Sequence, residues 1–469
     1  MDIQSPRSAA LWQSLIPVVS LIFFLGINIF LFAGSPHIPL VLGTVVACIV
    51  GLFLGFSWRQ MEESIVQGIM VAIQACLILL VIGMLIGTWI LSGIVPFMIY
   101  CGLKLLAPSL FLVTTCLICS LISLATGSSW STVGTVGVAL IGVGQGLGIP
   151  LPMVAGAIIS GSYLGDKISP LSDTTNLAPA VVGTDMFKHI RHMMYTTMPA
   201  YVVALLLYAL LGLLTAQNRV EGTEIYAIMS ALQQNFNLNP LLLLPPLLVI
   251  LMVLFRIPAL PALLGGAVIG GLFALFLQDT SLQQVMTVAQ SGFVSTTGID
   301  AVDQLLTRGG MESMLSTVAL IICALAFGGA MEGTGMLMAI GGAILRLARS
   351  IGTLVLATIL TCITMNVIAP DQYLSIVVPG RMYREAFRQR GLAAVNLSRC
   401  LEDSGTLSSP LIPWNTCGAY IWATLGIYPF AYLPFAFLNI LTPLVSIFYG
   451  FTGITIRRLD DNDPESRPV

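Results

Sequence analysis

The side chains best suited to chemistry in this sequence are carboxylates within long apolar stretches. Asp166 and Asp173 both lie in LGDKISPLSDTTNLAP (residues 164–179), which also contains two prolines. The other carboxylates of this kind are Glu332, Asp371, Glu402 and Asp403. A charge at the centre of a bilayer costs about 2.5–3.5 kcal/mol, so we expect these groups to be paired, hydrated or functional. Loss of water also favours the protonated carboxylate, so a proton and a cation can compete for one site.

Hydroxyl and amide side chains accompany these carboxylates. The residues that we expect to bind the cation and the proton are Asp166, Asp173, Thr174, Asn176, Asp371, Asp403, Ser404 and Asn415. Supporting roles are expected for Ser128, Ser129, Lys167, Glu332, Glu402, Thr406 and Ser409. Such oxygens are hard ligands, so Na⁺ is the metal ion that we expect at the cation-binding residues.

A purely structural role stays open for several of these residues. Lys167 follows Asp166 directly, and Arg399 precedes Glu402 by one helical turn, so either pair is placed to form an ion pair. Glu332, in AMEGTG, is equally compatible with a structural role and with a position facing a neighbouring helix break.

An enzyme is the alternative that these residues favour least. Ser128 and Ser129 have no histidine that the expected topology brings near them. His189 and His192, in KHIRH, are two of only three histidines in the chain, so we do not expect a metal centre there. We therefore expect no catalytic residues and no cofactor.

The composition predicts a membrane protein. Of 469 residues, 57% are hydrophobic and only 9% are charged, whereas soluble domains carry about 25% charged residues. The net charge of −2 and the scattered basic residues exclude an electrostatic surface for nucleic acid. We expect a polytopic α-helical protein in the cell inner membrane.

Apolar stretches long enough to cross a bilayer occur about ten times. Uninterrupted crossings are expected at about 11–33, 38–57, 65–93, 193–215, 241–255, 257–277, 313–340 and 430–455. Polar, Pro-rich segments interrupt two further crossings, at about 151–187 and 393–427.

Two more segments, 108–147 and 353–380, have polar centres and are either single crossings or re-entrant hairpins. If the N-terminus is cytoplasmic and 353–380 is re-entrant, 14 of the 19 Lys and Arg residues fall on the cytoplasmic side. We therefore expect both termini in the cytoplasm.

The sequence also contains an internal repeat. TTCLICSLISLATGSSWSTVG (114–134) resembles LATILTCITMNVIAPDQYLSIVV (356–378), and GDKISPLSDTTN (165–176) resembles EDSGTLSSPLIPWN (402–415). We expect two inverted repeats, each with five crossings and one re-entrant hairpin, whose discontinuous helices meet near the membrane midplane. The expected divisions are N-terminal spans (1–60), a first repeat core (61–216), an extracytoplasmic loop with linking spans (217–280), a second repeat core (281–456) and a cytoplasmic tail (457–469).

The longer motif also resembles a known family. GDKISPLSDTTNLAPAVVGTDMFKHIRHMMYTTMPAY is similar to the signature region of the NhaC family of Na⁺/H⁺ antiporters, and EDSGTLSSPLIPWNTCGAY resembles its second-half counterpart. The resemblance covers about residues 60–455. It implies a homodimer with inverted repeats that exchanges Na⁺ for H⁺ by an elevator-like movement. The family includes a branch that resembles malate–lactate exchangers.

Secondary active exchange of Na⁺ for H⁺ is therefore the expected function. The alternative is transport of a small organic anion such as malate or lactate, coupled to Na⁺ or H⁺. In that case the anion would lie against helix N-termini, aided by Arg399 or Lys167. A passive channel is a further alternative, which an inverted repeat disfavours.

Overall fold

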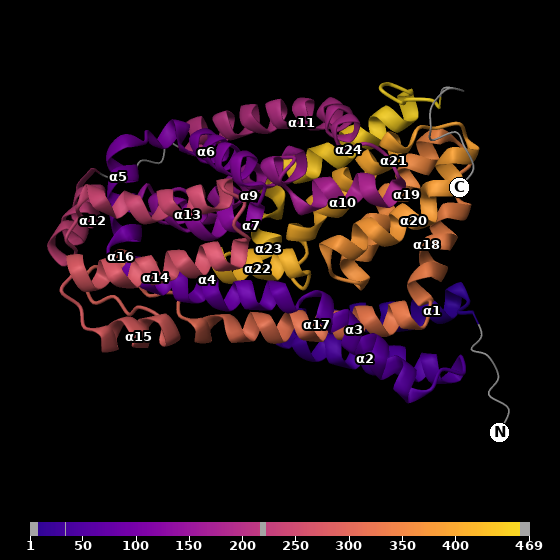
Figure 1. Cartoon of the computed structure of the whole chain (residues 1–469), viewed down its shortest axis with the longest axis horizontal. Coiled ribbons are helices and arrows are strands. Elements are labelled where there is room, and N and C mark those ends of the chain that lie inside the picture. The colour runs from indigo at the N-terminus through magenta and orange to yellow at the C-terminus, as the bar shows by residue number, and fades with distance from the viewer. Residues whose placement is uncertain (1–7, 33, 216–221, 460–469) are drawn as a thin grey trace.

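The computed structural model describes residues 8–32, 34–215 and 222–459 and is a bundle of α-helices (Figure 1). Within these residues there is no β-strand, only two isolated bridges, Phe293 with Arg308 and Leu392 with Arg458. In the described part of the chain, seven helices are long and apolar enough to cross a membrane, or up to nine if each of two bent pairs is one span. The expectation of an all-helical polytopic membrane protein is confirmed at this level.

The chain folds into the following elements. Up to residue 235 the helices are α1 (Leu11–Phe32), α2 (His37–Phe53), α3 (Trp58–Val71), α4 (Ile73–Leu91), α5 (Ile94–Leu105), α6 (Phe111–Thr126), α7 (Ser129–Thr132), α8 (Val138–Gly146), α9 (Leu151–Ile168), α10 (Asp173–Val182), α11 (Met186–Thr215) and α12 (Gly222–Asn235). From residue 244 they are α13 (Leu244–Leu254), α14 (Ala259–Leu277), α15 (Leu282–Ser291), α16 (Asp300–Leu306), α17 (Leu315–Gly333), α18 (Met336–Arg346), α19 (Ile351–Ile368), α20 (Gln372–Gln389), α21 (Ala394–Leu401), α22 (Thr416–Leu425), α23 (Pro429–Tyr432) and α24 (Phe437–Thr452). Short 3₁₀ turns are η1 (Pro108–Leu110), η3 (Pro240–Leu243), η4 (Met311–Met314), η6 (Ser409–Leu411) and η7 (Leu433–Phe435), and π-helical turns are η2 (Val133–Gly137) and η5 (Glu402–Thr406).

Several expected crossings are divided in the structure. The stretch 65–93 changes helix at Ala72, and 313–340 changes helix at Gly335, whose positive φ ends the straight path of α17. The stretch 241–255 forms only the short α13, which bends by 100° from α12. Apolar composition over each expected crossing did not reveal these divisions, because the length of an apolar stretch does not show where a helix ends and the next begins.

The first polar-centred segment reverses direction. Ser169, just after α9, donates to the carbonyl of Leu124 at the end of α6 (2.9 Å), and Gly161 packs on Cys116, so α6 and α9 run parallel. Gly144 of α8 instead packs against Val154 near the start of α9, so α8 runs antiparallel to both. The chain therefore turns back between α6 and α8.

The second polar-centred segment reverses in the same way. The hydroxyl groups of Thr361 on α19 and Tyr383 on α20 are 2.7 Å apart, and Arg390 after α20 donates to the carbonyl of Ala348 before α19 (2.6 Å). The segments just before α19 and just after α20 therefore lie at the same end of the molecule. Figure 1 shows α18 to α21 at that end and α5, α12 and α16 at the opposite end.

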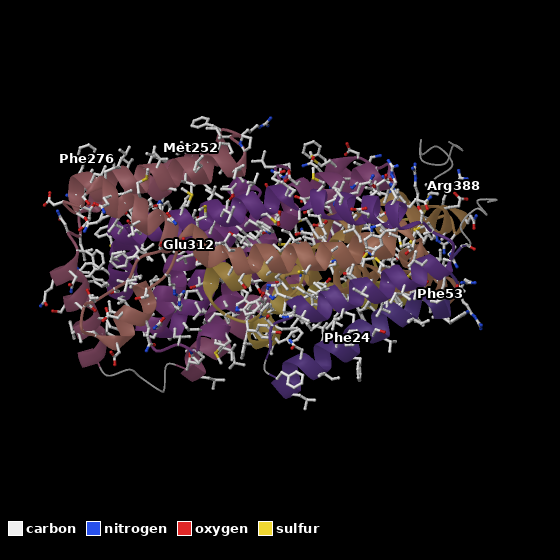
Figure 2. The ribbon with its side chains drawn as sticks, turned by 90° about the horizontal axis from the view of Figure 1, so that it is seen from below. Phe24, Phe53, Met252, Phe276, Glu312 and Arg388 are labelled. Atoms are coloured by element: carbon white, nitrogen blue, oxygen red, sulfur yellow. The ribbon has the colours of Figure 1, made fainter. Side chains whose placement is uncertain are left out.

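The outer surface of the bundle is strongly apolar. Phe53 is 84% exposed and Phe276 is 79% exposed, and Figure 2 shows both side chains projecting from the bundle. The same view places Arg388 at one end of the long axis. Of the basic residues that set the expected orientation, Arg7, Arg219 and Arg467 lie outside the described residues, as does most of the expected tail.

Candidate functional site

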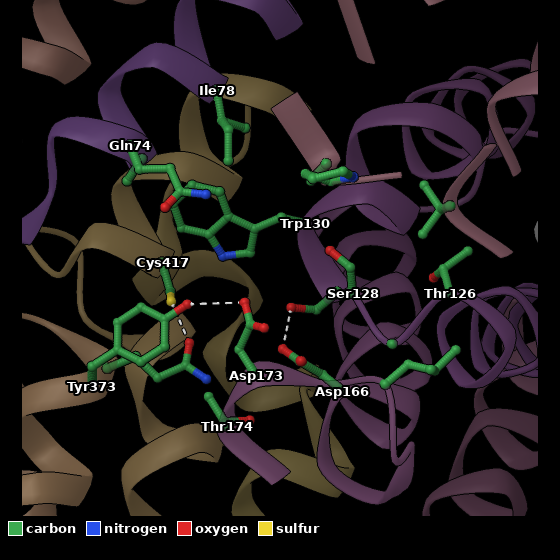
Figure 3. Close-up of a pocket in the computed structure, with 18 of the residues that line it drawn as sticks. Gln74, Ile78, Thr126, Ser128, Trp130, Asp166, Asp173, Thr174, Tyr373 and Cys417 are labelled. Carbon is green, nitrogen blue, oxygen red and sulfur yellow. Dashed lines mark hydrogen bonds between the residues drawn. The ribbon is translucent and has the colours of Figure 1, made fainter. Parts of the chain in front are cut away.

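Four interruptions in helices meet at one pocket of about 590 Å³ (Figure 3). They are the breaks between α6 and α7, between α9 and α10, between α19 and α20, and between η5 and α22. The residues that they contribute are Thr126, Gly127, Ser128, Ser129, Trp130, Asp166, Pro170, Leu171, Asp173, Thr174, Asp371, Gln372, Tyr373, Thr416 and Cys417. In an apolar environment, irregular backbone is stable only where it is buried in protein or lines a hydrated cavity. A pocket at these four breaks satisfies that condition.

Asp166 is the best-supported carboxylate of the pocket. It lies in the last turn of α9, where only 8% of it is exposed. Ser129 donates to its Oδ2 atom (2.6 Å), and Ser172 donates to its Oδ1 atom (2.7 Å). Two hydroxyl donors from two different breaks therefore fix this carboxylate at the pocket wall.

Asp371 is held by backbone rather than by hydroxyl groups. It is the N-cap of α20, and its Oδ1 atom accepts from the amides of Tyr373 (2.9 Å) and Leu374 (3.1 Å). This is the usual way in which an aspartate satisfies the free amides of a first helical turn. The carboxylate is 3% exposed and lines the pocket.

Asp173 is the exposed carboxylate of the three. It begins α10, so the positive end of the helix dipole favours its charge. The phenol of Tyr373 donates to its Oδ2 atom at 3.5 Å, the outer limit of a hydrogen bond. Figure 3 shows Tyr373, Asp173 and Asp166 together on one side of the pocket.

Three further residues expected at the site lie at the breaks. Thr174 lines the pocket and its hydroxyl is 3.2 Å from that of Ser172. Ser128 also lines the pocket and caps α7 through the amide of Ser131 (3.2 Å). Asn176 instead holds the backbone of the break, because its amide donates to the carbonyls of Pro170 and Ser172.

Asp403 and Ser404, which were expected at the cation site, are not among the described residues that line the pocket. Asp403 forms an ion pair with Lys167 and accepts from Thr196 (3.1 Å). Lys167 therefore pairs with a residue from the second half of the chain and not with its neighbour Asp166. The hydroxyl of Ser404 donates to the carbonyl of Cys400 within its own helix.

The ion pair between Arg399 and Glu402, which the sequence left open, is not formed among the described residues. Arg399 donates to Thr455 (2.8 Å), and Glu402 accepts from Thr406 (2.6 Å). The side chains of Arg399, Glu402 and Thr406 are buried, so these two hydrogen bonds contribute to the packing around η5. Glu332 is exposed at the end of α17 and does not line the pocket.

Asn415 and Ser409 support the break before α22. Asn415 caps α22 through the amide of Cys417 (3.0 Å) and donates to Asn366 (2.9 Å). Ser409 and Cys417 both donate to the side-chain carbonyl of Gln372, at 3.4 and 2.8 Å. These bonds join the break before α22 to the start of α20.

Sequence reasoning missed several pocket residues. Trp130 stacks on Tyr420 with ring centroids 4.1 Å apart, and the Tyr420 hydroxyl donates to the Trp130 carbonyl (2.6 Å). Gln372 and Tyr373 lie inside the polar motif MNVIAPDQY (365–373), and this motif could have indicated that they belong to the site. Arg256 lies between the expected crossings 241–255 and 257–277, in the turn between α13 and α14, and it also lines the pocket.

The chemistry of this pocket is that of a cation-binding site built from mixed oxygens. Three carboxylates face one basic side chain, Arg256, among the described lining residues. Within the described part of the chain, no three His, Cys, Asp or Glu side chains gather as a metal cluster. A bound cation would therefore depend on hydroxyl and carbonyl oxygens as well as on carboxylates.

Comparisons with known proteins agree with this chemistry. The family model "Na+/H+ antiporter family" matches residues 8–175 and 161–454. The Na⁺/H⁺ antiporter NhaC of Alkalihalophilus pseudofirmus is 40% identical over 430 residues, which cover 92% of this chain and 93% of that protein. The malate-2H⁺/Na⁺-lactate antiporter of Bacillus subtilis is 38% identical, covering 87% of each chain. The arginine/ornithine antiporter ArcD of Halobacterium salinarum is 36% identical, covering 100% of this chain and 96% of that protein.

Proposed function

Because the chain belongs to the Na⁺/H⁺ antiporter family, we propose that it is a secondary active transporter that exchanges cytoplasmic Na⁺ for external H⁺. The convergence of four helix interruptions on one pocket with three carboxylates is the observation that carries the proposal. At such a site either a proton or a cation neutralises the carboxylates, and alternating access to the two sides couples their movements. The scheme requires no cofactor besides the transported ions.

Asp166 and Asp371 are the proposed centre of the ion site. Each is buried, each lines the pocket, and they come from opposite halves of the chain. Ser129 and Ser172 each donate to Asp166, and each hydroxyl oxygen keeps lone pairs that can coordinate a cation beside this carboxylate. Asp173 and Thr174 complete the shell, whereas Asp403 acts through its ion pair with Lys167.

The proposed architecture is a pair of inverted repeats with cores at 61–216 and 281–456, joined by 217–280. The order of elements supports it. Along the first half of the chain, α8 comes between α6 and α9 and runs in the opposite direction to both. Along the second half, α20 comes between α19 and α21 and runs back along α19. We propose that each returning pair is a re-entrant hairpin and that the breaks meet near the membrane midplane.

The proposed location is the cell inner membrane, with both termini in the cytoplasm. The segments that carry Arg346, Arg390 and Arg457 meet at one end of the molecule, where Arg390 donates to Ala348 and the Arg457 carbonyl accepts from Ala393. Positive charge favours the cytoplasmic side, which supports this orientation. A homodimer is proposed from the family resemblance.

Transport of a small organic anion is the second candidate. A volume of about 590 Å³ and the presence of Arg256 favour it, and one relative is named as a malate and lactate antiporter. The three carboxylates in the same pocket disfavour an anion, because they would repel it.

A vesicle assay tests both candidates. Purified protein is reconstituted into liposomes that enclose a pH-sensitive dye, and Na⁺, K⁺, malate and lactate are added outside in turn. External Na⁺ is expected to raise the internal pH, and Asp166→Asn is expected to abolish the signal. Thr44→Val is the control, because the Thr44 hydroxyl only bonds the Leu40 carbonyl within α2. Unchanged transport after separate Asn substitution of Asp166, Asp173, Asp371 and Asp403 would refute the site.

A further inference from the structure

The pocket is much larger than an inorganic ion needs. A dehydrated Na⁺ ion fits among a few oxygen atoms, and one water molecule takes about 30 Å³ in the liquid. The pocket measures about 590 Å³, within the range of about 300–1,000 Å³ that is typical of sites for organic ligands. Most of its volume is therefore free for a ligand beyond the ion that we propose at Asp166 and Asp371.

Asp173 retains the most accessible acceptor capacity of the three carboxylates that line the pocket. Asp166 accepts a hydroxyl bond on each oxygen, and Asp371 accepts two backbone amides. Asp173 is exposed, and its bond from the phenol of Tyr373 is long, at 3.5 Å. A carboxylate accepts about four hydrogen bonds, so Asp173 is the group best able to receive strong N–H donors from a ligand.

An aromatic and apolar wall lies opposite this carboxylate. Figure 3 shows Trp130 and Ile78 on one side of the pocket, with the polar amide of Gln74 beside them, and Asp173 and Thr174 on the other side. The indole of Trp130 is fixed by its stack on Tyr420, with an angle of 7° between the rings. A rigid indole face attracts an organic cation and also packs against an aliphatic chain.

We infer that this pocket binds a small organic cation with a primary ammonium group, whose N–H donors bond Asp173 and whose aliphatic part packs on Trp130. The inference rests on the proposed function, because the ligand would share the pocket with the transported ion. The charges of the pocket agree with a cation, since Arg256 is the one basic residue among the described lining residues and three carboxylates oppose it. Ligand and Na⁺ are then expected to compete.

Calorimetric titration of the full chain in detergent tests this inference. Butylammonium chloride is the probe, and tetramethylammonium chloride is the matched cation without N–H donors. Butylammonium is expected to bind, tetramethylammonium to bind at least about tenfold more weakly, and Na⁺ to reduce the apparent affinity for butylammonium. Equal binding of the two organic cations, or malate binding in place of butylammonium, would overturn the inference.

Three variants locate the ligand. Asp173→Asn is expected to abolish butylammonium binding, and Asp173→Glu to restore part of it. Trp130→Ala is expected to weaken butylammonium at least tenfold more than it weakens Na⁺, with the ratio of the two affinities as the readout. Leu121→Ala is the control, because Leu121 is 68% exposed on the outer surface of α6. If the ratio of the butylammonium and Na⁺ affinities is the same in Trp130→Ala as in the control, the site is refuted. Na⁺-driven proton movement in amine-free vesicles tests the proposed function separately.

Discussion

Lys167, in the last turn of α9, forms an ion pair with Asp403, in the π-helical turn η5, and both side chains are fully buried. The pair therefore joins the two halves of the chain at the residue that follows Asp166, which lines the pocket. Thr196 of α11 also donates to Asp403, which brings a third helix to the same point. This arrangement assigns Asp403 a positioning role, since the ion pair fixes the end of α9 on which Asp166 lies.

Removal of one partner of this pair is expected to destabilise the fold. Lys167→Met or Asp403→Leu alone would leave a buried charge without its partner, which typically costs about 3–5 kcal/mol. The double variant removes both charges and is expected to recover most of that loss. Thermal unfolding in detergent measures the effect. If the double variant is no more stable than the less stable of the two single variants, pairing of the two charges does not contribute to the stability of the fold.

The hydroxyl groups on Asp166 are expected to control the affinity for Na⁺. A hydrogen bond to a charged group contributes about 1.5–3 kcal/mol, and a tenfold change in affinity corresponds to about 1.4 kcal/mol. Ser129→Ala and Ser172→Ala are each expected to change the apparent Na⁺ affinity about tenfold or more, because each bonds one oxygen of Asp166. Na⁺ titration of proton movement in vesicles measures this.

Thr44→Val is again the matched control. Like the two serines, Thr44 bears a hydroxyl, but its bond is to a carbonyl within α2, far in sequence from any break. An equal change in Na⁺ affinity for the control and for Ser129→Ala would show that the serine hydroxyl groups are not part of the site.

The sequence predicted the positions of the breaks better than it predicted the partners of the charges. Proline cannot continue a helix and polar residues are costly in lipid, so Pro170 and its neighbours marked a break that the structure confirms between Ile168 and Asp173. Lys167, in contrast, has an acidic neighbour in sequence but points to Asp403 in the other half of the chain. Which acid a lysine meets depends on tertiary packing, and local spacing does not contain that information.

The aromatic residues of the pocket were beyond sequence reasoning for a related reason. Trp130 is an ordinary apolar residue by composition, and its role follows only from its stack on Tyr420, in the other half of the chain. Arg256 is a similar case. The sequence indicated a connection between the expected crossings 241–255 and 257–277, but not that this connection lies beside the pocket. Both depend on contacts between segments that are distant in sequence.

Close packing of α6 on α9 is expected to tolerate no side chain at Gly165. A Cβ atom at this position would overlap backbone atoms of Ser123 and Leu124, and backbone cannot move aside as a flexible side chain can. Gly165→Ala is therefore expected to lower the melting temperature of the protein in detergent and to reduce transport, because Asp166 is the next residue. Gly342→Ala is the control, since a Cβ there would meet no atom within 4 Å. Equal melting temperatures of the two variants would contradict this packing.

Asp303 is expected to hold the loop between α15 and η4 in a pH-dependent manner. Its carboxylate accepts from the amides of Thr297 (2.7 Å) and Gly298 (3.1 Å) and from the hydroxyl of Ser295 (2.7 Å). The backbone amide of Thr297, followed by the hydroxyl of Ser295, lowers the pKa of Asp303 below its ordinary value. A carboxyl whose pKa is lowered in the folded state stabilises the fold at any pH above its pKa in the unfolded chain, about 3.9. This contribution is lost as the pH falls through the pKa of the folded state.

Hydrogen exchange of residues 293–308, corrected for the intrinsic rate at each pH, measures this effect. Wild-type protein is expected to keep its protection from neutral pH down to about pH 4 and to lose it below, because only there does Asp303 take up a proton. Asp303→Asn is expected to exchange faster at neutral pH, since a neutral amide is a weaker acceptor for these donors. Asp300→Asn, at the exposed start of α16, is the matched control for loss of one charge in the same loop. If both variants exchange alike, the protection comes from the net charge of the loop and not from the hydrogen bonds of Asp303.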